Sequence, residues 1–182
     1  MVDPIRSIAI VCKQGCRRAA ELGSYLHDHV GRVAAPKSVR LLRDGRQAGG
    51  ADLIVSVGGD GTLLRAAAAA AASTRRPSPL FLPVAGGASL GFMLPFSPAD
   101  AAELLARLLR SRSAARHVPV LERMRLSVEL VGRSGSRTGP PSLRRPALAL
   151  NEVNIHRGAS PSLAHLQCIV DGTPLTCAIS DG

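Results

Sequence analysis

A glycine-rich turn with an acid at its centre is the stretch of this sequence best suited to chemistry. It reads Gly58-Gly59-Asp60-Gly61-Thr62, after an apolar strand-like run and before a run of helix formers. A strand, a glycine turn and a helix N-terminus together present backbone N–H groups to a phosphate. Asp60 would repel that phosphate unless its carboxylate acts as a general base or holds a metal ion. The alternative is a tight turn in which Asp60 only caps the helix.

A second group of polar residues lies near the end of the sequence. Asn151 and Glu152 interrupt the apolar run Ala147 to Ile155, Arg157 follows shortly, and Asp181 stands before a glycine. Adjacent residues of a strand point to opposite faces, so one of Asn151 and Glu152 could meet a ligand while the other supports the backbone. Glu152 could accept hydrogen bonds from ribose hydroxyls, and Arg157 could meet a phosphate. A polar pair at a strand edge and a solvated loop arginine are the alternatives.

Strands and helices alternate through the first part of the chain. The predicted strands are Ser7–Val11, Ser38–Leu42, Leu53–Val57 and Leu80–Val84. The predicted helices are Arg17–Val30 and Leu63–Ala72, the latter directly after Thr62. A third helix begins at Ser97-Pro98, with Ser97 as its N-cap and Pro98 at the first helical position. Short strands separated by helices favour a parallel sheet covered on both faces. We therefore predict a Rossmann-like α/β domain over residues 1–118, with the glycine turn directly after its third strand.

After about residue 118 the pattern changes to strands alone. Arg123–Val131 alternates apolar and polar residues as a half-buried strand does. Further strand-like runs are Ala147–His156, Leu166–Val170 and Pro174–Ile179, the last two joined by a hairpin turn at Asp171-Gly172. We predict that residues 119–182 are the first strands of an antiparallel β domain that is incomplete in this chain.

The composition narrows the range of partners. The chain has 182 residues, 46% hydrophobic and only 2% aromatic, so its core must be aliphatic and it offers few stacking surfaces for single-stranded nucleic acid. The formal charge is +10, and every basic residue except Lys13 and Lys37 is arginine, which suits an anionic ligand. A solvated arginine-rich surface is the alternative. No apolar stretch reaches the roughly 18 residues that a membrane span needs. We expect no nucleic acid or membrane partner, and a soluble, cytoplasmic protein.

Cysteine and histidine do not form a recognisable metal site. Four cysteines and five histidines are present, but no CxxC pair occurs and the histidines do not complete a zinc ligand set. We therefore predict no metal bound by the protein alone. Cys12, Cys168 and Cys177 lie in strand-like runs, so we expect buried free thiols and no disulfide framework.

Three motifs in this order resemble the NAD kinase family, of the eukaryotic type, over nearly the whole chain. They are GGDGT followed by Leu63-Leu64, SLGF-x-x-PF at Ser89–Phe96, and NE followed by HRG at Asn151–Gly158. The closing segment Asp171–Gly182 is also similar to that family. GGDGT alone is shared with lipid kinases and phosphofructokinases, whereas the NE motif at this distance makes the combination specific.

The resemblance implies a transferase of NADP biosynthesis. The γ-phosphate of ATP would pass to the adenosine ribose 2′-hydroxyl of NAD, with Mg²⁺ or another divalent cation carried by the ATP phosphates. Asp60 matches the family's catalytic carboxylate, and the glycine turn around it would bind nucleotide. By the same matching, the remaining nucleotide contacts would come from Phe92, Asn151, Glu152 and Asp181. The intact family member would be a homo-oligomer.

The sequence also departs from that family. Gly86 stands where Asn or His is frequent, Ala88 stands where glycine is usual, and Ile179 replaces a residue that is often basic in bacterial relatives. The family's serine-, threonine- and glycine-rich segment and most of its β domain would follow Gly182. We therefore predict an N-terminal fragment of an NAD kinase with little activity alone. The alternatives are a GGDGT-type lipid kinase domain and a non-catalytic nucleotide-binding or subunit-interaction module.

Overall fold

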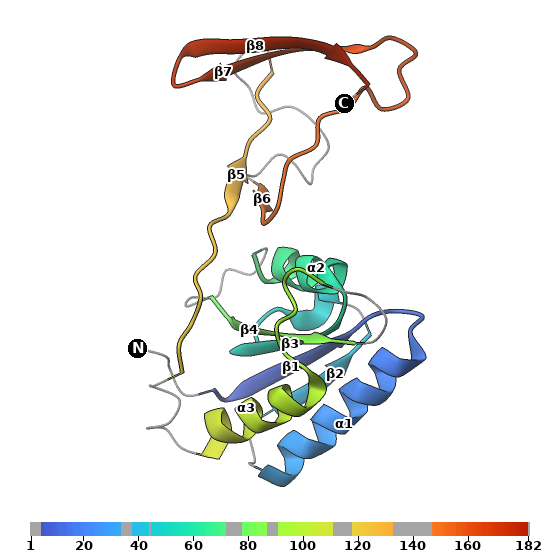
Figure 1. The fold of residues 1–182 in the computed structure, drawn as a ribbon, viewed down its shortest axis with the longest axis vertical. Coiled ribbons are helices and arrows are strands. Elements are labelled where there is room, and N and C mark those ends of the chain that lie inside the picture. The colour runs from blue at the N-terminus through green and yellow to red at the C-terminus, as the bar shows by residue number, and fades with distance from the viewer. Residues whose placement is uncertain are drawn as a thin grey trace. The chain divides into compact units, whose positions relative to one another are not determined.

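The chain forms two compact units, residues 1–123 and 124–182. The computed structural model describes residues 5–33, 38–43, 45–71, 78–86, 91–110, 118–132 and 147–181. Figure 1 shows the helices gathered in the first unit and only strands in the second. Among the helices so described, none combines the length and the apolar character that a bilayer crossing requires.

The first unit is built on a parallel sheet of four strands. These are β1 (Ser7–Cys12), β2 (Ser38–Leu42), β3 (Leu53–Gly58) and β4 (Leu80–Ala85), in the order β2-β1-β3-β4. After β1 the chain adds β2 on one side and then returns to add β3 on the other, so the strand order reverses between β1 and β3. Open α/β sheets bind ligands outside the carboxyl ends of the strands at such a switch point. All four predicted strands are confirmed.

Helices cover both faces of this sheet, as predicted. α1 (Arg17–Val33) and α3 (Pro98–Arg110) pack on one face, and α2 (Asp60–Ala71) packs on the other with the short 3₁₀ helix η1 (Gly45–Ala48), which the sequence did not predict. Alternate residues of the central strands pack on opposite faces of the sheet. Ile8 and Ile10 of β1 face α1 and α3, whereas Ala9 faces α2. The core is aliphatic, as the composition requires.

The second unit consists of two antiparallel strand pairs. β5 (Leu126–Val128) pairs with β6 (Ala147–Ala149), and β7 (Ala164–Val170) pairs with β8 (Thr173–Ser180). The predicted turn at Asp171-Gly172 is confirmed, with φ of 49° and 79°, the double positive φ that a type I′ hairpin needs. None of the residues described in this unit is buried.

Two of the predicted strands are much shorter in the structure. Strands were expected over Arg123–Val131 and Ala147–His156, but within the described residues the strands are limited to Leu126–Val128 paired with Ala147–Ala149. A strand persists only where a neighbour completes its hydrogen bonds, and the alternating pattern of β5 says nothing about where its partner stops. The mixed α/β fold with antiparallel hairpins is nevertheless the predicted fold class.

Candidate functional site

The turn between β3 and α2 is tight because its first glycine is enclosed. A Cβ atom on Gly58 would lie 2.5 Å from Thr62 Oγ1 and 2.9 Å from Lys13 Cβ, so a larger residue would force a shift. Thr62 is buried, and its N–H donates to Gly59 O over 2.9 Å. All six residues of β3 are buried, so the core fixes the strand that carries this turn. The predicted turn therefore lies at the carboxyl edge of the sheet, beside the switch point.

Asp60 is the first residue of α2, three residues before the predicted helix start at Leu63, and its carboxylate is held from outside that helix. Oδ2 accepts a 3.0 Å hydrogen bond from the N–H of Phe92, and Oδ1 accepts a 3.1 Å bond from the N–H of Met93. A carboxylate that only capped its own helix would instead accept from N–H groups of that first turn. The geometry therefore favours a carboxylate held in place for a ligand.

The segment after β4 approaches the glycine turn through its backbone as well. The Gly86 N–H donates to Gly58 O over 3.1 Å. A Cβ atom on Gly86 would lie 2.6 Å from Gly58 N and 2.7 Å from Gly58 Cα, which leaves room only for glycine. The departure at Gly86 thus has a structural reason in this chain. The departure at Ala88, together with Ser89 and Leu90 of the SLGF motif, lies outside the described residues.

The two residues that hold Asp60 differ in what their side chains do. Phe92 is 91% exposed, so its ring faces solvent, whereas Met93 is 5% exposed and anchors the segment in the protein. Phe92 was singled out from its motif, but neither the Met93 donor nor the part played by the Phe92 N–H was predicted. No sequence pattern marks a backbone donor, because every residue except proline has one.

Lys13 is a further residue that the sequence did not single out as a site. It follows β1 directly, and its N–H donates to Val57 O over 2.9 Å. Its side chain is exposed and forms no hydrogen bond or ion pair within the part of the chain that the structure describes. The rule that ligands bind at the switch point could have identified Lys13 from the sequence. Lys13 directly follows β1, the strand next to the one that carries the glycine turn.

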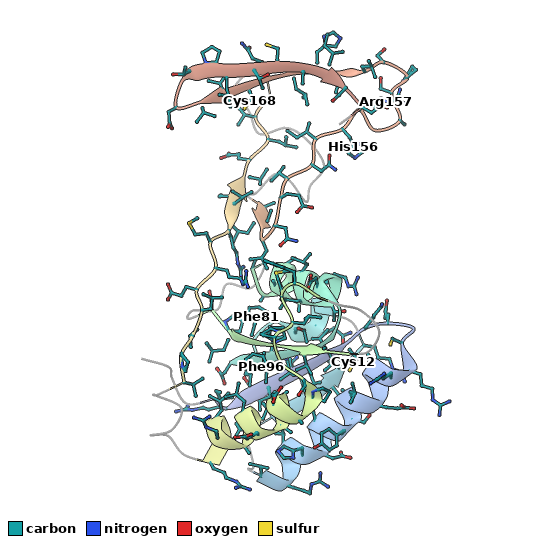
Figure 2. The ribbon with its side chains drawn as sticks, viewed as in Figure 1. Cys12, Phe81, Phe96, His156, Arg157 and Cys168 are labelled. Carbon is teal, nitrogen blue, oxygen red and sulfur yellow. The ribbon has the colours of Figure 1, made fainter. Side chains whose placement is uncertain are left out.

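The site residues predicted from the second unit fall into two groups. Asn151 and Glu152 are exposed and lie beyond the end of β6, so the prediction that they interrupt a strand is wrong. Arg157 and Asp181 are brought together: Arg157 Nε lies 2.7 Å from Asp181 Oδ1, and the Arg157 N–H donates to Asp181 O over 3.2 Å. Figure 2 shows Arg157 beside one end of the β7–β8 hairpin. Arg157 Nη1 also donates to Pro161 O over 2.9 Å, which fixes the guanidinium on this loop.

The cysteine prediction is only half right. Cys12 is buried at the carboxyl end of β1 (Figure 2), and burial raises the pKa of its thiol. Cys168 and Cys177 are exposed, contrary to prediction, because no described residue of their unit is buried and the hairpin has both faces open. The four thiols are free. Across the described ranges, no group of three or more His, Cys, Asp or Glu side chains is arranged to hold a metal ion.

Comparison with known proteins agrees with this architecture. The ATP-NAD kinase N-terminal domain matches residues 8–113, which include the parallel sheet, the glycine turn and Asp60. The structure of yeast NADH kinase complexed with NADH superposes with a TM-score of 0.76 at 21% identity, covering 98% of this chain and 56% of that protein. At that identity the superposition supports the fold.

Two sequence relatives point the same way. The mitochondrial NADH kinase pos5 of Schizosaccharomyces pombe is 37% identical over 131 residues, which is 72% of this chain and 30% of that protein. The NAD kinase of Methylococcus capsulatus is 30% identical over an alignment that covers all of this chain and 61% of that protein. The chain therefore spans less than two thirds of the length of these relatives. With more than half of its residues matched by the family's N-terminal domain, the chain belongs to the NAD kinase family.

Proposed function

We propose that this chain carries the catalytic turn of an NAD kinase, which transfers the γ-phosphate of ATP to the adenosine ribose 2′-hydroxyl of NAD. The observation that carries the proposal is Asp60, whose two carboxylate oxygens are held by backbone N–H groups beside a phosphate-friendly turn at the switch point. Neither a lipid kinase nor a non-catalytic module is favoured by the relatives, which are named as NAD and NADH kinases.

Asp60 acts in this proposal as the general base. Each carboxylate oxygen uses one lone pair on an N–H group and keeps another free to accept the 2′-hydroxyl proton. The hydroxyl oxygen then bonds to the γ-phosphorus, the bond from that phosphorus to the bridging oxygen breaks, and ADP leaves with the electron pair. General-base help is worth about 10²- to 10⁴-fold, and the rest comes from positioning and charge neutralisation.

The phosphates are bound at the other side of the turn. Gly59, Gly61 and the N-terminus of α2 supply backbone donors and a favourable dipole there. Lys13 adds an exposed cation without a partner in the described structure, which offsets the charge that Asp60 brings. Mg²⁺ fits as an ion carried by ATP, since the described residues offer no group of three ligands.

The remaining contacts to the dinucleotide are proposed from the residues that the sequence singled out. The exposed ring of Phe92 offers an apolar face on which a base can stack. Glu152 accepts hydrogen bonds from the ribose hydroxyls, Asn151 can both donate and accept them, and the exposure of both residues leaves them free to do so. Asp181 contacts an amide or base nitrogen and Arg157 a phosphate, which requires ligand binding to compete with their ion pair. A homo-oligomeric assembly and a cytoplasmic location complete the proposal.

The Asp60→Asn substitution tests the proposal directly. Asparagine keeps the shape of the side chain but is no base, so we expect kcat for NADP formation to fall about 10²- to 10⁴-fold with little change in either KM. NADP is measured with an NADP-specific dehydrogenase. Asp28→Asn, on an exposed part of α1, is the matched control and keeps the wild-type rate. A rate in Asp60→Asn that equals the wild-type rate would show that another group takes the proton.

A further inference from the structure

Gly91 lies directly before the two residues that hold Asp60, and the proposed function leaves it unexplained. Its φ is not in the left-handed region, so glycine is not needed there for backbone freedom. The reason must be space. A Cβ atom at this position would overlap Leu94 Cδ1, and it would lie 2.5 Å from Leu94 Cγ and 2.7 Å from Asp60 Oδ1, all too close for a non-bonded contact.

The carboxylate has little freedom to avoid such a methyl group. Asp60 is anchored in the first turn of α2, and its side chain is short, so Oδ1 can withdraw only by rotating the whole carboxylate. Oδ1 is also the oxygen that accepts from Met93. A side chain at position 91 therefore strains or breaks that hydrogen bond, although Asp60 itself is not substituted.

We propose that Gly91 is a positioning residue for Asp60. The missing side chain lets the carboxylate lie on the N–H groups of Phe92 and Met93, and this contact sets the direction in which the base faces the acceptor hydroxyl. The role in catalysis rests on the proposed function, whereas the contact itself does not. Gly91 thereby positions the Asp60 carboxylate, whereas the Phe92 ring contacts the nucleotide.

A double-mutant cycle on stability tests the contact without any assay of activity. Gly91→Ala is made in the wild-type chain and in Asp60→Ala, and the melting temperatures of all four proteins are compared. If Gly91 makes room for the carboxylate, its replacement lowers the melting temperature less when Asp60 is already alanine. An equal drop in both backgrounds overturns the proposal and assigns Gly91 to packing against Leu94.

Amide signals give a second measurement that also reports on poorly stable variants. In ¹⁵N-labelled protein, Asp60→Asn shifts the amide protons of Phe92 and Met93, because their acceptor loses its charge. Gly91→Ala is expected to move the Met93 signal in the same direction, with the β3 amides unchanged. Signals of Phe92 and Met93 that keep their wild-type positions in Gly91→Ala contradict the proposal.

Kinetics then separate positioning from nucleotide binding. Gly91→Ala is expected to lower kcat about 10²-fold, the effect of displacing a catalytic group by about 1 Å, with KM for NAD within about twofold of wild type. Phe92→Ala is expected to raise KM for NAD instead. Adding Leu94→Ala to Gly91→Ala removes the overlap with Leu94 alone, so kcat stays low, and its recovery in that double variant overturns the proposal. If the cycle and the amide shifts hold but no variant forms NADP, the proposed function fails and the contact stands.

Discussion

Lys13 and Asp60 place opposite charges on two sides of one glycine turn. The lysine follows β1, the aspartate begins α2, and Gly58 between them has no room for a side chain. Phosphates of ATP need a cation near a turn that also carries a carboxylate, because backbone donors alone do not offset that negative charge. At the residue scale we therefore propose that Lys13 serves the donor nucleotide as a cation and that Asp60 serves the acceptor hydroxyl as a base.

The Lys13→Ala substitution is expected to raise KM for ATP about 10-fold while KM for NAD stays near the wild-type value. A hydrogen bond to a charged group contributes about 1.5–3 kcal/mol, and 1.4 kcal/mol corresponds to a factor of ten. The KM for ATP is obtained from initial rates of NADP formation at several ATP concentrations. Lys13→Arg keeps most of the affinity, and Arg110→Ala, at the far end of α3, serves as the control. An unchanged KM for ATP in Lys13→Ala contradicts a phosphate contact.

The sequence predicted the residues of the turn but not what holds them. Gly58 to Thr62 could be found because glycine pairs and an isolated acid leave a visible pattern. The two donors to Asp60 could not, since they are main-chain groups that come from a segment 32 and 33 residues away. Asn151 and Glu152 were expected within a strand-like run, but β6 ends at Ala149, before both residues.

Two glycines of α1 make a matched pair at the scale of elements. A Cβ atom on Gly23 would overlap Cys12 Sγ and lie 3.2 Å from Leu41 Cδ1, whereas one on Gly31 would meet nothing within 4 Å. Glycine at position 23 therefore lets the helix approach the sheet, and Gly31 has no such reason.

Opposite effects on stability follow from that pair. Gly23→Ala is expected to lower the free energy of unfolding by about 1–3 kcal/mol, because it overfills the interface between α1 and β1. Gly31→Ala is expected to raise it by about 0.5–1 kcal/mol, because alanine loses less backbone entropy in a helix. Urea denaturation followed by circular dichroism measures both. If both substitutions raise the free energy of unfolding, or both lower it, close packing at Gly23 is not what distinguishes the two positions.

The start of α3 carries a pH-dependent cap. The Ser97 hydroxyl donates to Asp100 Oδ2 over 2.6 Å, and the Ser97 N–H donates to the same oxygen over 3.1 Å. These two bonds, the hydroxyl one first, lower the pKa of the Asp100 carboxyl. A carboxyl whose pKa falls on folding stabilises the protein fully above its ordinary pKa. That stabilisation is lost as the pH falls through the lower folded value.

Ser97→Ala is therefore expected to destabilise the chain most at neutral pH and less in acid. The hydroxyl bond to the charged carboxylate is what the variant loses, and that bond weakens in the wild type too once Asp100 is protonated. Urea denaturation of both proteins at neutral pH and at several acid values shows the trend. A difference between the two proteins that grows on acidification has the wrong sign for this cap.

The elements of the first unit were more predictable than those of the second for a physical reason. Buried strands and amphipathic helices carry their own periodicity, and β1 to β4 all matched it. The start of α2 was placed three residues late, because glycine and aspartate are poor helix formers and only the fold shows that they lie in its first turn. β5 and β6 depend on each other across a long separation in sequence, so their ends follow from pairing rather than pattern.

At the scale of the whole chain, burial is confined to one unit. Every residue of the buried hydrophobic core lies between Ile8 and Leu108, and none of the described residues after Arg123 is buried. The hairpin β7–β8 is paired along its length apart from an irregularity between Cys168 and Ile169, but no residue described in its unit is buried beneath it. Isolated two-stranded hairpins are marginally stable in water.

Hydrogen exchange of this chain is expected to reflect that division. Amides of β3, buried along its whole length, exchange slowest, and those of β7 and β8 exchange far earlier because they open without disturbing the core. Exchange followed by mass spectrometry of peptides resolves the two groups. Protection of β7 and β8 equal to that of β3 would mean that the hairpin gains a partner in solution.

The two main-chain donors that hold Asp60 also determine which genetic changes at this site have a visible effect. Replacing Phe92 or Met93 by alanine leaves both main-chain N–H groups in place. The effect of Met93→Ala would therefore report the loss of side-chain packing and that of Phe92→Ala the loss of the ring, and neither would report the hydrogen bonds to Asp60. Apart from substitutions of Asp60 itself, the contact is changed by any side chain at position 91 and by proline at 92 or 93, which lacks the N–H. Gly91 is therefore the position in this segment where even a single added carbon atom reaches the carboxylate.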